Sequence, residues 1–475
     1  MEKTRTFPKG MFWPFLLLTL LFFAWAVPNN LTDTMLAAFK RVFSLSDSKT
    51  AWIQVVCYLL GYGLFALPGA YFIKRYTYKS GVILGLLLYA IGSFLFYPAM
   101  LLLSVNAEIS FSMFLFAIFV LFAGLSVLET STNSYVCAIG DPETATRRLN
   151  FTQSFNPFGA IAGVVISQIF ILSKLNVLNA GERSLLAEEE LRVIQGQELT
   201  MITTTYVVIG ICMLMIMLAF ILTKMPKMKE HDANVSLKKS FTRLLKNKNY
   251  VWGVIAQFFY VGAQIAVWSF TIRYAIQQLN LDQIISSLGK LAGPQDITAA
   301  LISAEPLAAC FYKACQVISL DQLLPRTAEQ AAATYYIMSL ILFVVFRFVS
   351  TFLMKFISPG KLLIAYSILA VLLSIVVIYN ETNIGLYALV GISGFMSLMF
   401  PTIYSFGIKG LGDDTKIGGA GMIMSIAGAA VLTQIQGILS DQLGDIHFAY
   451  WVPAIAFMVV LYFALVVVNK NVKKV

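Results

Sequence analysis

Four charged side chains lie inside otherwise apolar segments of the chain. Two are acids, Asp33 and Glu129, and two are bases, Arg273 and Arg347. An ionisable group in such a segment is expensive to bury, so it tends to pair with an opposite charge, to hold a proton or to line a pathway. We therefore predict that Glu129, deep in a long apolar segment, takes up and releases a proton, with a static ion pair to Arg273 or Arg347 as the alternative for each acid. For Asp33, nearer the end of its segment, a solvated side chain without a special role is a further alternative. For the arginines we expect a gate or an interhelical ion pair.

Motifs that mark other chemistries are missing from the sequence. There is no P-loop, dinucleotide fingerprint, nucleophile elbow or HExxH zinc motif. His231 and His447 are predicted in loops, and a disulfide between Cys310 and Cys315 has no support from their spacing. We predict no catalytic residue, no metal site and no cofactor, and hence a protein that is not an enzyme.

The composition indicates an integral membrane protein. Of 475 residues, 59% are hydrophobic and 12% charged, and the mean hydropathy is +0.78, whereas soluble domains are roughly 45–50% apolar and 25% charged. The apolar runs are continuous, which excludes an outer-membrane barrel, a soluble enzyme and a secreted disulfide scaffold. Because a span takes about 20 apolar residues, the sequence predicts twelve transmembrane helices, over 11–37, 49–73, 81–103, 110–139, 150–173, 199–223, 251–277, 333–357, 362–379, 384–407, 417–440 and 448–469.

The formal net charge of +10 is explained by the orientation of these helices. With a cytoplasmic N-terminus, 23 of the 34 Lys and Arg residues fall on the inner side, whereas 15 of the 24 acids fall outside. This bias predicts both termini in the cytoplasm and no nucleic-acid partner. The first span, with Lys3, Arg5 and Lys9 before it, could be taken for a cleavable signal, but its apolar pattern continues to Phe39.

The twelve spans fall into two groups of six. We predict an N-terminal bundle over 1–223, a basic cytoplasmic linker over 224–250 that lies on anionic lipid, and a C-terminal bundle over 251–475. An external excursion over 278–332 is predicted to form one or two amphipathic helices. The ends of the second and eighth spans, 70–74 and 351–355, align as a weak parallel repeat. This organisation is typical of transporters that bind substrate near mid-membrane, and such a carrier works as a monomer.

Five longer motifs carry a family resemblance. They are FAWAVPNNLTD at 23–33, LET with Asn133 in the fourth span, RLN, QSFN and FGA within 148–160, YVGAQ, WS and IRY within 260–274, and PTIYSFGIK, LG and DTK within 401–416. Together they resemble the bacterial L-fucose/proton symporters of the major facilitator superfamily, over roughly 12–277 and 333–440. Pro28 and Ser134 depart from the pattern, since we expect a small residue and a proline there, and 278–332 is longer than expected.

The resemblance implies a sugar site built from amides and aromatic rings. Sugar hydroxyls take hydrogen bonds from amides, and the C–H faces of the ring pack on aromatic side chains. Asn30 and Gln153 match positions where the family binds sugar, and the resemblance implies that Asp33 takes part in proton coupling. A capping or helix-contact role is the alternative for Gln153, and packing or lipid contact is the alternative for each ring. The full set of candidate binding residues is Trp25, Asn30, Asn133, Gln153, Asn156, Tyr260, Gln264 and Trp268.

These observations lead to one expected function and two rivals. We expect an all-α protein of the major facilitator fold, with twelve transmembrane helices and parallel pseudo-symmetry, in the bacterial inner membrane. It would import a monosaccharide, L-fucose or a related hexose, together with a proton. A drug or metabolite exporter of the same fold would have a broader and more apolar site, and a sugar sensor would bind without transport.

Overall fold

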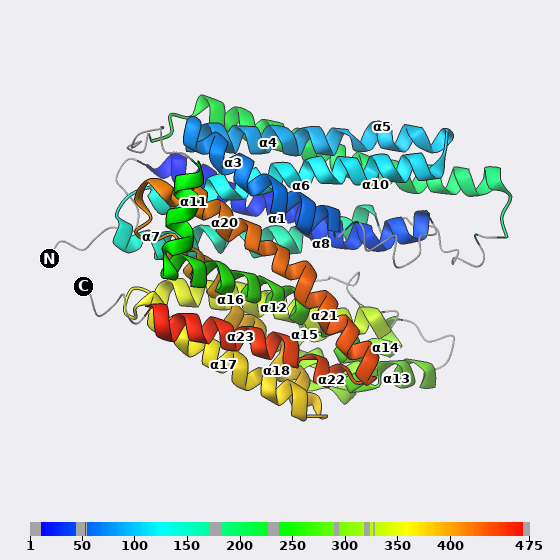
Figure 1. The fold of residues 1–475 in the computed structure, drawn as a ribbon. Helices are drawn as coiled ribbons and strands as arrows, with labels where there is room; N and C mark the ends of the chain where they lie inside the picture. Colours follow the sequence, from blue (N-terminus) through cyan, green and yellow to red (C-terminus); the bar gives the residue numbers. More distant parts are fainter. Residues whose placement is uncertain are drawn as a thin grey trace. The chain divides into compact units, whose positions relative to one another are not determined.

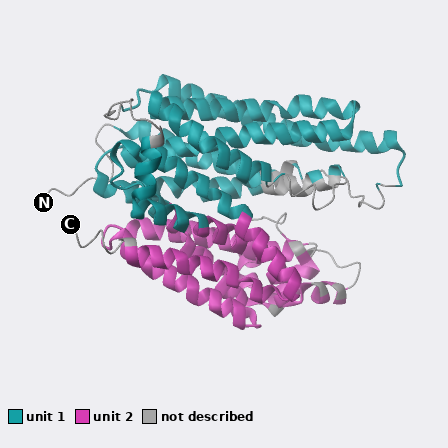
Figure 2. Cartoon of the chain, viewed as in Figure 1, with its two compact units in different colours: residues 1–258, 401–430 teal, residues 259–400, 431–475 magenta. Residues whose placement is uncertain are grey.

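The computed structural model describes residues 11–43, 53, 55–171, 183, 185–226, 237–288, 294–317, 324–325 and 328–468. These residues form helices joined by short turns (Figure 1). They divide into two compact units, which Figure 2 distinguishes by colour. Unit 1 consists of 1–258 and 401–430, and unit 2 of 259–400 and 431–475. Residues 401–430 thus pack with the N-terminal part of the chain. The predicted division of the chain into two bundles at the basic linker, 224–250, concerns the halves that move during transport, and it stays a prediction.

Unit 1 is built around α6, a long apolar helix over Ala107–Ala138. Asn106 caps its start by accepting hydrogen bonds from the backbone of Glu108 and Ile109. Helix α4 packs along α6, and α8 packs along α1. The other helices of unit 1 are α1 Phe12–Val42, the π-helix η1 Val55–Tyr62, α3 Gly63–Arg75, α4 Tyr78–Phe94, α5 Phe96–Leu101, α7 Ala145–Gln153, α8 Asn156–Phe170, α10 Glu188–Leu222, α11 Leu237–Lys246, the start of α12 Lys248–Leu279, α19 Met399–Gly407 and α20 Thr415–Met424.

Small residues allow the helices of unit 1 to approach closely. A Cβ atom at Gly159 or Gly163 of α8 would collide with the backbone carbonyl oxygens of Phe23 and Val27 in α1. The two glycines are four residues apart and therefore share one face of the helix. Since helices in lipid lack a hydrophobic driving force for association, such close contact supplies the packing energy.

Unit 2 contains the remaining spans and the segment 278–332, which was predicted to be external. The described residues of this segment form three separate helices, whereas one or two were predicted. A buried carboxylate, Glu305, caps α15 through the backbone N–H groups of Leu307 and Ala308 and also accepts hydrogen bonds from the hydroxyls of Tyr335 and Tyr387. The helices of unit 2 are the rest of α12, α13 Leu281–Ser287, α14 Pro294–Ala304, α15 Pro306–Val317, α16 Ala328–Leu353, α17 Pro359–Tyr379, α18 Asn383–Met396, α21 Gly428–Leu443, α22 Ile446–Ala449 and α23 Trp451–Phe463.

Eleven helices in the described part of the chain are long and apolar enough to cross a membrane. The segment predicted as the fifth span, 150–173, is divided differently. It begins in α7, turns at Ser154 and Phe155, and continues as the 15-residue helix α8.

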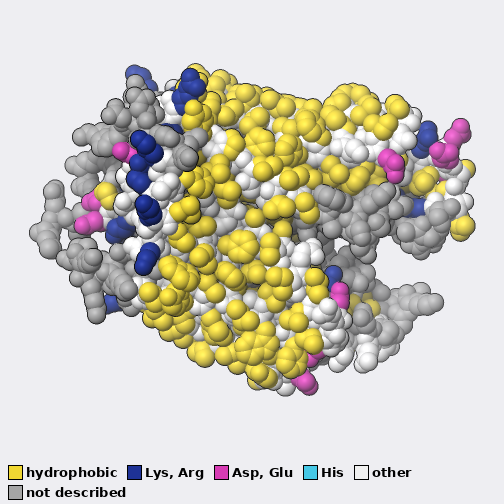
Figure 3. Space-filling model, in the orientation of Figure 1, with side chains coloured by type: hydrophobic (Ala, Val, Ile, Leu, Met, Phe, Trp, Pro, Cys, Tyr) yellow, Lys and Arg dark blue, Asp and Glu magenta, His cyan; other side chains and the backbone are white. Residues whose placement is uncertain are grey.

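On the face of unit 1 in Figure 3, hydrophobic side chains cover the middle and charged side chains lie at the ends, with Lys and Arg concentrated near α11. This charge distribution agrees with the predicted orientation.

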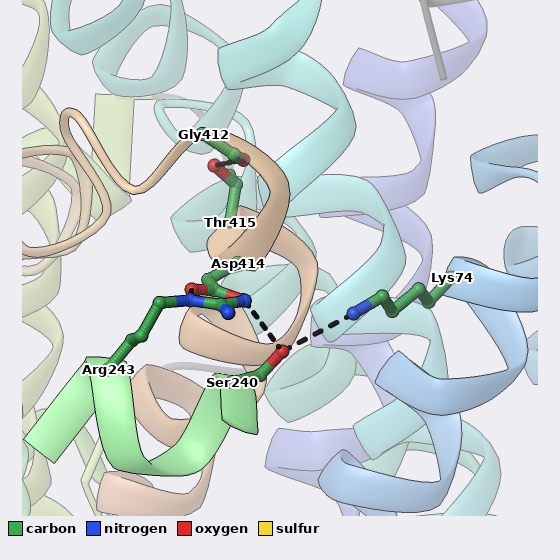
Figure 4. A network of polar contacts seen from close by, with 6 residues as sticks. All are labelled: Lys74, Ser240, Arg243, Gly412, Asp414 and Thr415. Atoms are coloured by element: carbon green, nitrogen blue, oxygen red, sulfur yellow. Dashed lines mark hydrogen bonds and ion pairs between the residues drawn. The ribbon is translucent and has the colours of Figure 1, made fainter. Parts of the chain in front are cut away.

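The basic linker contributes a helix that is anchored to unit 1. In Figure 4, Arg243 of α11 forms a bidentate ion pair with Asp414, through Nε and Nη2 at 2.7 Å each. Ser240 accepts a hydrogen bond from Lys74 at the end of α3, with an N–O distance of 3.3 Å. Lys416 donates to the carbonyl oxygen of Ile73. These contacts join α11, α3 and the start of α20 at the basic end of the unit.

Candidate functional site

The carboxyl group of Glu129 lies deep in unit 1 and is bound by a phenol. Glu129 is only 7% exposed, and its Oε1 accepts a hydrogen bond from the Tyr62 hydroxyl at 2.8 Å. Among the described residues of unit 1, no Lys or Arg lies within ion-pair distance of this carboxyl. The alternative of a static ion pair with Arg273 or Arg347, which belong to unit 2, stays a prediction. Tyr62 was not among the predicted site residues, since nothing in its apolar surroundings sets it apart.

Two of the predicted amides, on the neighbouring helices α6 and α7, form a chain of hydrogen bonds that ends at the backbone of Glu129. The Gln153 amide donates to Asn133 Oδ1 at 2.7 Å, and the Asn133 amide donates to the backbone carbonyl of Glu129 at 2.9 Å. Gln153 is the last residue of α7, where the helix ends in the turn before α8. The end of α7 thus directs this side chain to α6. Asn133 therefore lies one turn after Glu129 on α6, and Gln153 reaches that turn from α7.

The candidates on α1 lie at the proline interruption of that helix. Pro28 has no N–H, which removes one bond of the helical ladder. The Asn30 amide donates to the carbonyl oxygen of Ala26 at 2.9 Å, and the buried ring of Trp25 packs against Phe22. Asp33 lies on α1, but its side chain is outside the described residues.

Asn156, at the start of α8, contributes a contact to α1 from the neighbouring helix. Its amide donates to the carbonyl oxygen of Phe22 at 3.3 Å. Three of the predicted binding residues in unit 1 therefore donate an amide N–H to a backbone carbonyl oxygen: Asn30, Asn133 and Asn156.

One departure from the family pattern makes a specific contact. Ser134, where a proline was expected, lies 2.9 Å from the hydroxyl of Tyr404 in α19. A proline there would lack this hydroxyl.

Arg148 of α7 is a buried base outside the predicted site. It donates to the carbonyl oxygens of Val136, Cys137 and Asp141. Burial lowers the pKa of Arg148.

The candidates in unit 2 lie along α12 and α16. Tyr260 is buried and donates to the carbonyl oxygen of Met396, and the Trp268 indole donates to Ser393. Gln264 lies between them on the same face of α12 and is half-buried. These contacts hold both rings in place in unit 2.

The two arginines of the membrane segments differ in their surroundings. Arg347 is 3% exposed, and its guanidinium lies 4.8 Å from the centroid of the Phe343 ring. Arg273 is exposed and lies 5.2 Å from the ring of Phe270. The burial of Arg347 agrees with a gate or ion-pair role. The exposure of Arg273 gives no support to such a role.

The prediction that both histidines lie in loops was wrong for His447. This residue belongs to the short helix α22 and is 9% exposed, between Asp445 and Gln278. The aspartate caps that helix and so fixes the histidine. His231 is outside the described residues.

A bundle of apolar helices with a buried carboxyl group beside amides is typical of membrane transporters. Residues 14–426 match the model of the Major Facilitator Superfamily, and the chain belongs to this family. The predicted major facilitator fold is confirmed, and the protein is a multi-pass membrane transporter.

Three relatives show what the chain is similar to. It is 36% identical to the L-fucose-proton symporter of Haemophilus influenzae, over 96% of this chain and 97% of the relative. It is 28% identical to a glucose/galactose transporter of Brucella abortus, over 94% and 92% of the two chains. A crystal structure of the transporter FucP in the outward conformation is 34% identical, with a TM-score of 0.78, and the match covers 95% of this chain and 98% of that one. The resemblance drawn from the motifs is thus confirmed.

Proposed function

We propose that this chain is a symporter that imports a monosaccharide together with a proton, with L-fucose as the first candidate. The observation that carries the proposal is the Glu129 carboxyl group, which is buried, hydrogen-bonded to Tyr62 and without a Lys or Arg partner among the described residues of unit 1. A buried carboxylate without a counter-charge is costly, whereas its protonated form is neutral. Such a group is suited to take up a proton on one side and to release it on the other.

The amide chain next to this carboxyl supports a sugar as the substrate. Gln153 and Asn133 offer neutral donors and acceptors, which suit hydroxyl groups and give no counter-ion to a charged drug. The relatives named for L-fucose and for glucose and galactose support the same substrate class. We propose further that Asn30 and Asn156 take part in binding in unit 1, and that Gln264, Tyr260, Trp268 and Trp25 contribute amide or stacking contacts.

The proposed cycle is alternating access. A proton binds at Glu129, and Asp33 is the second residue that takes part in proton coupling. The sugar then binds to the amides, and the transporter with both bound opens to the inside. A proton that crosses the membrane gains about 2.3 kcal/mol per 100 mV, which drives roughly fiftyfold accumulation at one-to-one coupling. We propose that 1–223 and 251–475 are the moving halves, that the linker contacts anionic lipid, that Arg347 acts at a gate, and that the monomer is the working unit.

Purified protein in liposomes tests this proposal. An imposed inward proton gradient should drive accumulation of radiolabelled L-fucose, galactose or glucose, and sugar addition should acidify a lumen that holds a pH dye. The sugar accumulated most at low concentration is the substrate. Efflux of cationic dyes without any sugar response would instead favour an exporter, and sugar binding without movement would favour a sensor.

A further inference from the structure

The π-helix η1 ends at the residue that binds the Glu129 carboxyl. It runs over Val55–Tyr62 and continues as α3 from Gly63. A π-helical turn contains an extra residue, is rare, and is kept mostly at functional sites. Ser126 of α6 donates a hydrogen bond to the Tyr62 carbonyl oxygen at 3.3 Å. The end of the π-helix is therefore tied to the helix that carries Glu129.

Two aromatic neighbours fix the orientation of the Tyr62 ring. The ring is 1% exposed, stacks on Tyr58 with a centroid distance of 6.3 Å, and meets Phe122 edge to face at 6.0 Å. Since both neighbours hold the ring, the hydroxyl remains directed at Glu129. A phenol held in this way restricts the carboxyl group to one rotamer without neutralising its charge.

Other titratable groups near this pair are few in the described part of unit 1. The helices that pack against α6 are α4, α3, α5, α7, α20, α1, η1 and the 3-10 helix η2, Leu102–Ser104. Helix η1 contributes Tyr58, and α4 contributes Tyr89. The buried hydroxyl of Tyr89 has no hydrogen-bond partner among the described residues. Arg148 of α7 is held by carbonyl oxygens two turns farther along, and Lys416 of α20 by Ile73. The α1 side chains at 32–38, Asp33 included, are outside the described residues.

From this geometry we infer that Tyr62 is a positioning residue of the proton site, which holds the Glu129 carboxylate in one rotamer and sets the pH at which the transporter loads its proton. The inference rests on the proposed symport. A hydroxyl that donates to an ionised carboxylate makes a hydrogen bond roughly twice as strong as it makes to the protonated form. The hydroxyl therefore favours proton release over proton retention.

The test is Tyr62→Phe, which removes the hydroxyl and keeps the ring. In liposomes with equal pH on both sides, we expect sugar counterflow to continue, because exchange requires no net proton release. The pH at half-maximal uptake should move upward by about one unit, and uphill accumulation should fall. In a Glu129→Gln background the same substitution should add no further change, since both act on one proton.

Tyr89→Phe is the matched control, since it removes another buried tyrosine hydroxyl beside α6 that does not contact the carboxyl. Its pH profile should match that of the unmodified protein. An unmoved midpoint in Tyr62→Phe, in a protein that does couple sugar to protons, would overturn the inference and leave the proposed function intact. Absence of proton-coupled sugar uptake in the unmodified protein would instead remove the proposed function itself.

An infrared measurement covers the case in which Tyr62→Phe does not fold. Difference spectra of the unmodified protein between high and low pH should contain a shift of the tyrosine C–O band, visible with ring-labelled tyrosine. This shift should be missing in Glu129→Gln and present in Tyr89→Phe. An identical tyrosine shift in Glu129→Gln would refute the inference that the Tyr62 hydrogen bond changes when Glu129 gains or loses its proton.

Discussion

Asn133 offers the most specific test of the amide chain, because it contacts both Gln153 and the backbone of Glu129. The side chain is 1% exposed and accepts a hydrogen bond from Gln153, so we expect it to act on sugar binding by orienting Gln153. In Asn133→Ala the Gln153 amide loses its hydrogen bond to Asn133 Oδ1. A hydrogen bond of this kind contributes about 0.5–1.5 kcal/mol, so the affinity for sugar should fall by roughly 2- to 13-fold.

The assay for Asn133→Ala is equilibrium binding of the sugar by calorimetry in detergent, with counterflow in liposomes as the second measurement. Thr132→Ala is the matched control, since its buried hydroxyl donates to the carbonyl of Leu128 on the same helix and does not contact Gln153. The ratio of protons to sugar should not change in either variant, because the Glu129 carboxyl is bound by Tyr62. Unaltered affinity in a folded Asn133→Ala protein would show that this chain does not orient the sugar site.

Three further substitutions test separate parts of the account. Asn30→Ala should weaken sugar affinity in the same calorimetric titration, and an unchanged value would remove this residue from the binding set. Gly163→Val should reduce the yield of monodisperse protein in size-exclusion chromatography, because a Cβ there collides with the Val27 carbonyl, whereas Gly63→Val should be tolerated since open space surrounds that position. Asp414→Asn should lower the thermal midpoint by a few degrees at most, because its partner Arg243 is half-exposed. High salt should shrink that difference, and a salt-independent loss would contradict an ion-pair origin.

The sequence predicted the parts of the site that depend on composition. A carboxyl such as Glu129 stands out in a long apolar segment, because burying a charge there is expensive. The predicted spans also match the helices closely, since a membrane requires continuous apolar runs of a given length. The family motifs added Asn133 and Gln153, which the structure brings together in one hydrogen-bonded chain.

Contacts that depend on tertiary packing could not be predicted in this way. Tyr62 reaches Glu129 because a π-helical turn shifts the register of its helix, and no spacing of apolar residues encodes that shift. The pairing of 401–430 with unit 1 likewise depends on contacts such as Ser134 with Tyr404. A signal was available for the helix contact at Gly159 and Gly163, since small residues four apart mark close packing in membranes.

Proton coupling through Glu129 is the central claim, and accumulation driven by a proton gradient tests it most directly. Glu129→Gln keeps the shape of the side chain and removes the titratable proton, and Glu108→Gln, at the exposed start of the same helix, is the control. We predict that Glu129→Gln abolishes uphill sugar accumulation while counterflow and sugar binding persist, and that the control accumulates sugar normally. Unchanged uphill accumulation in Glu129→Gln would contradict the account.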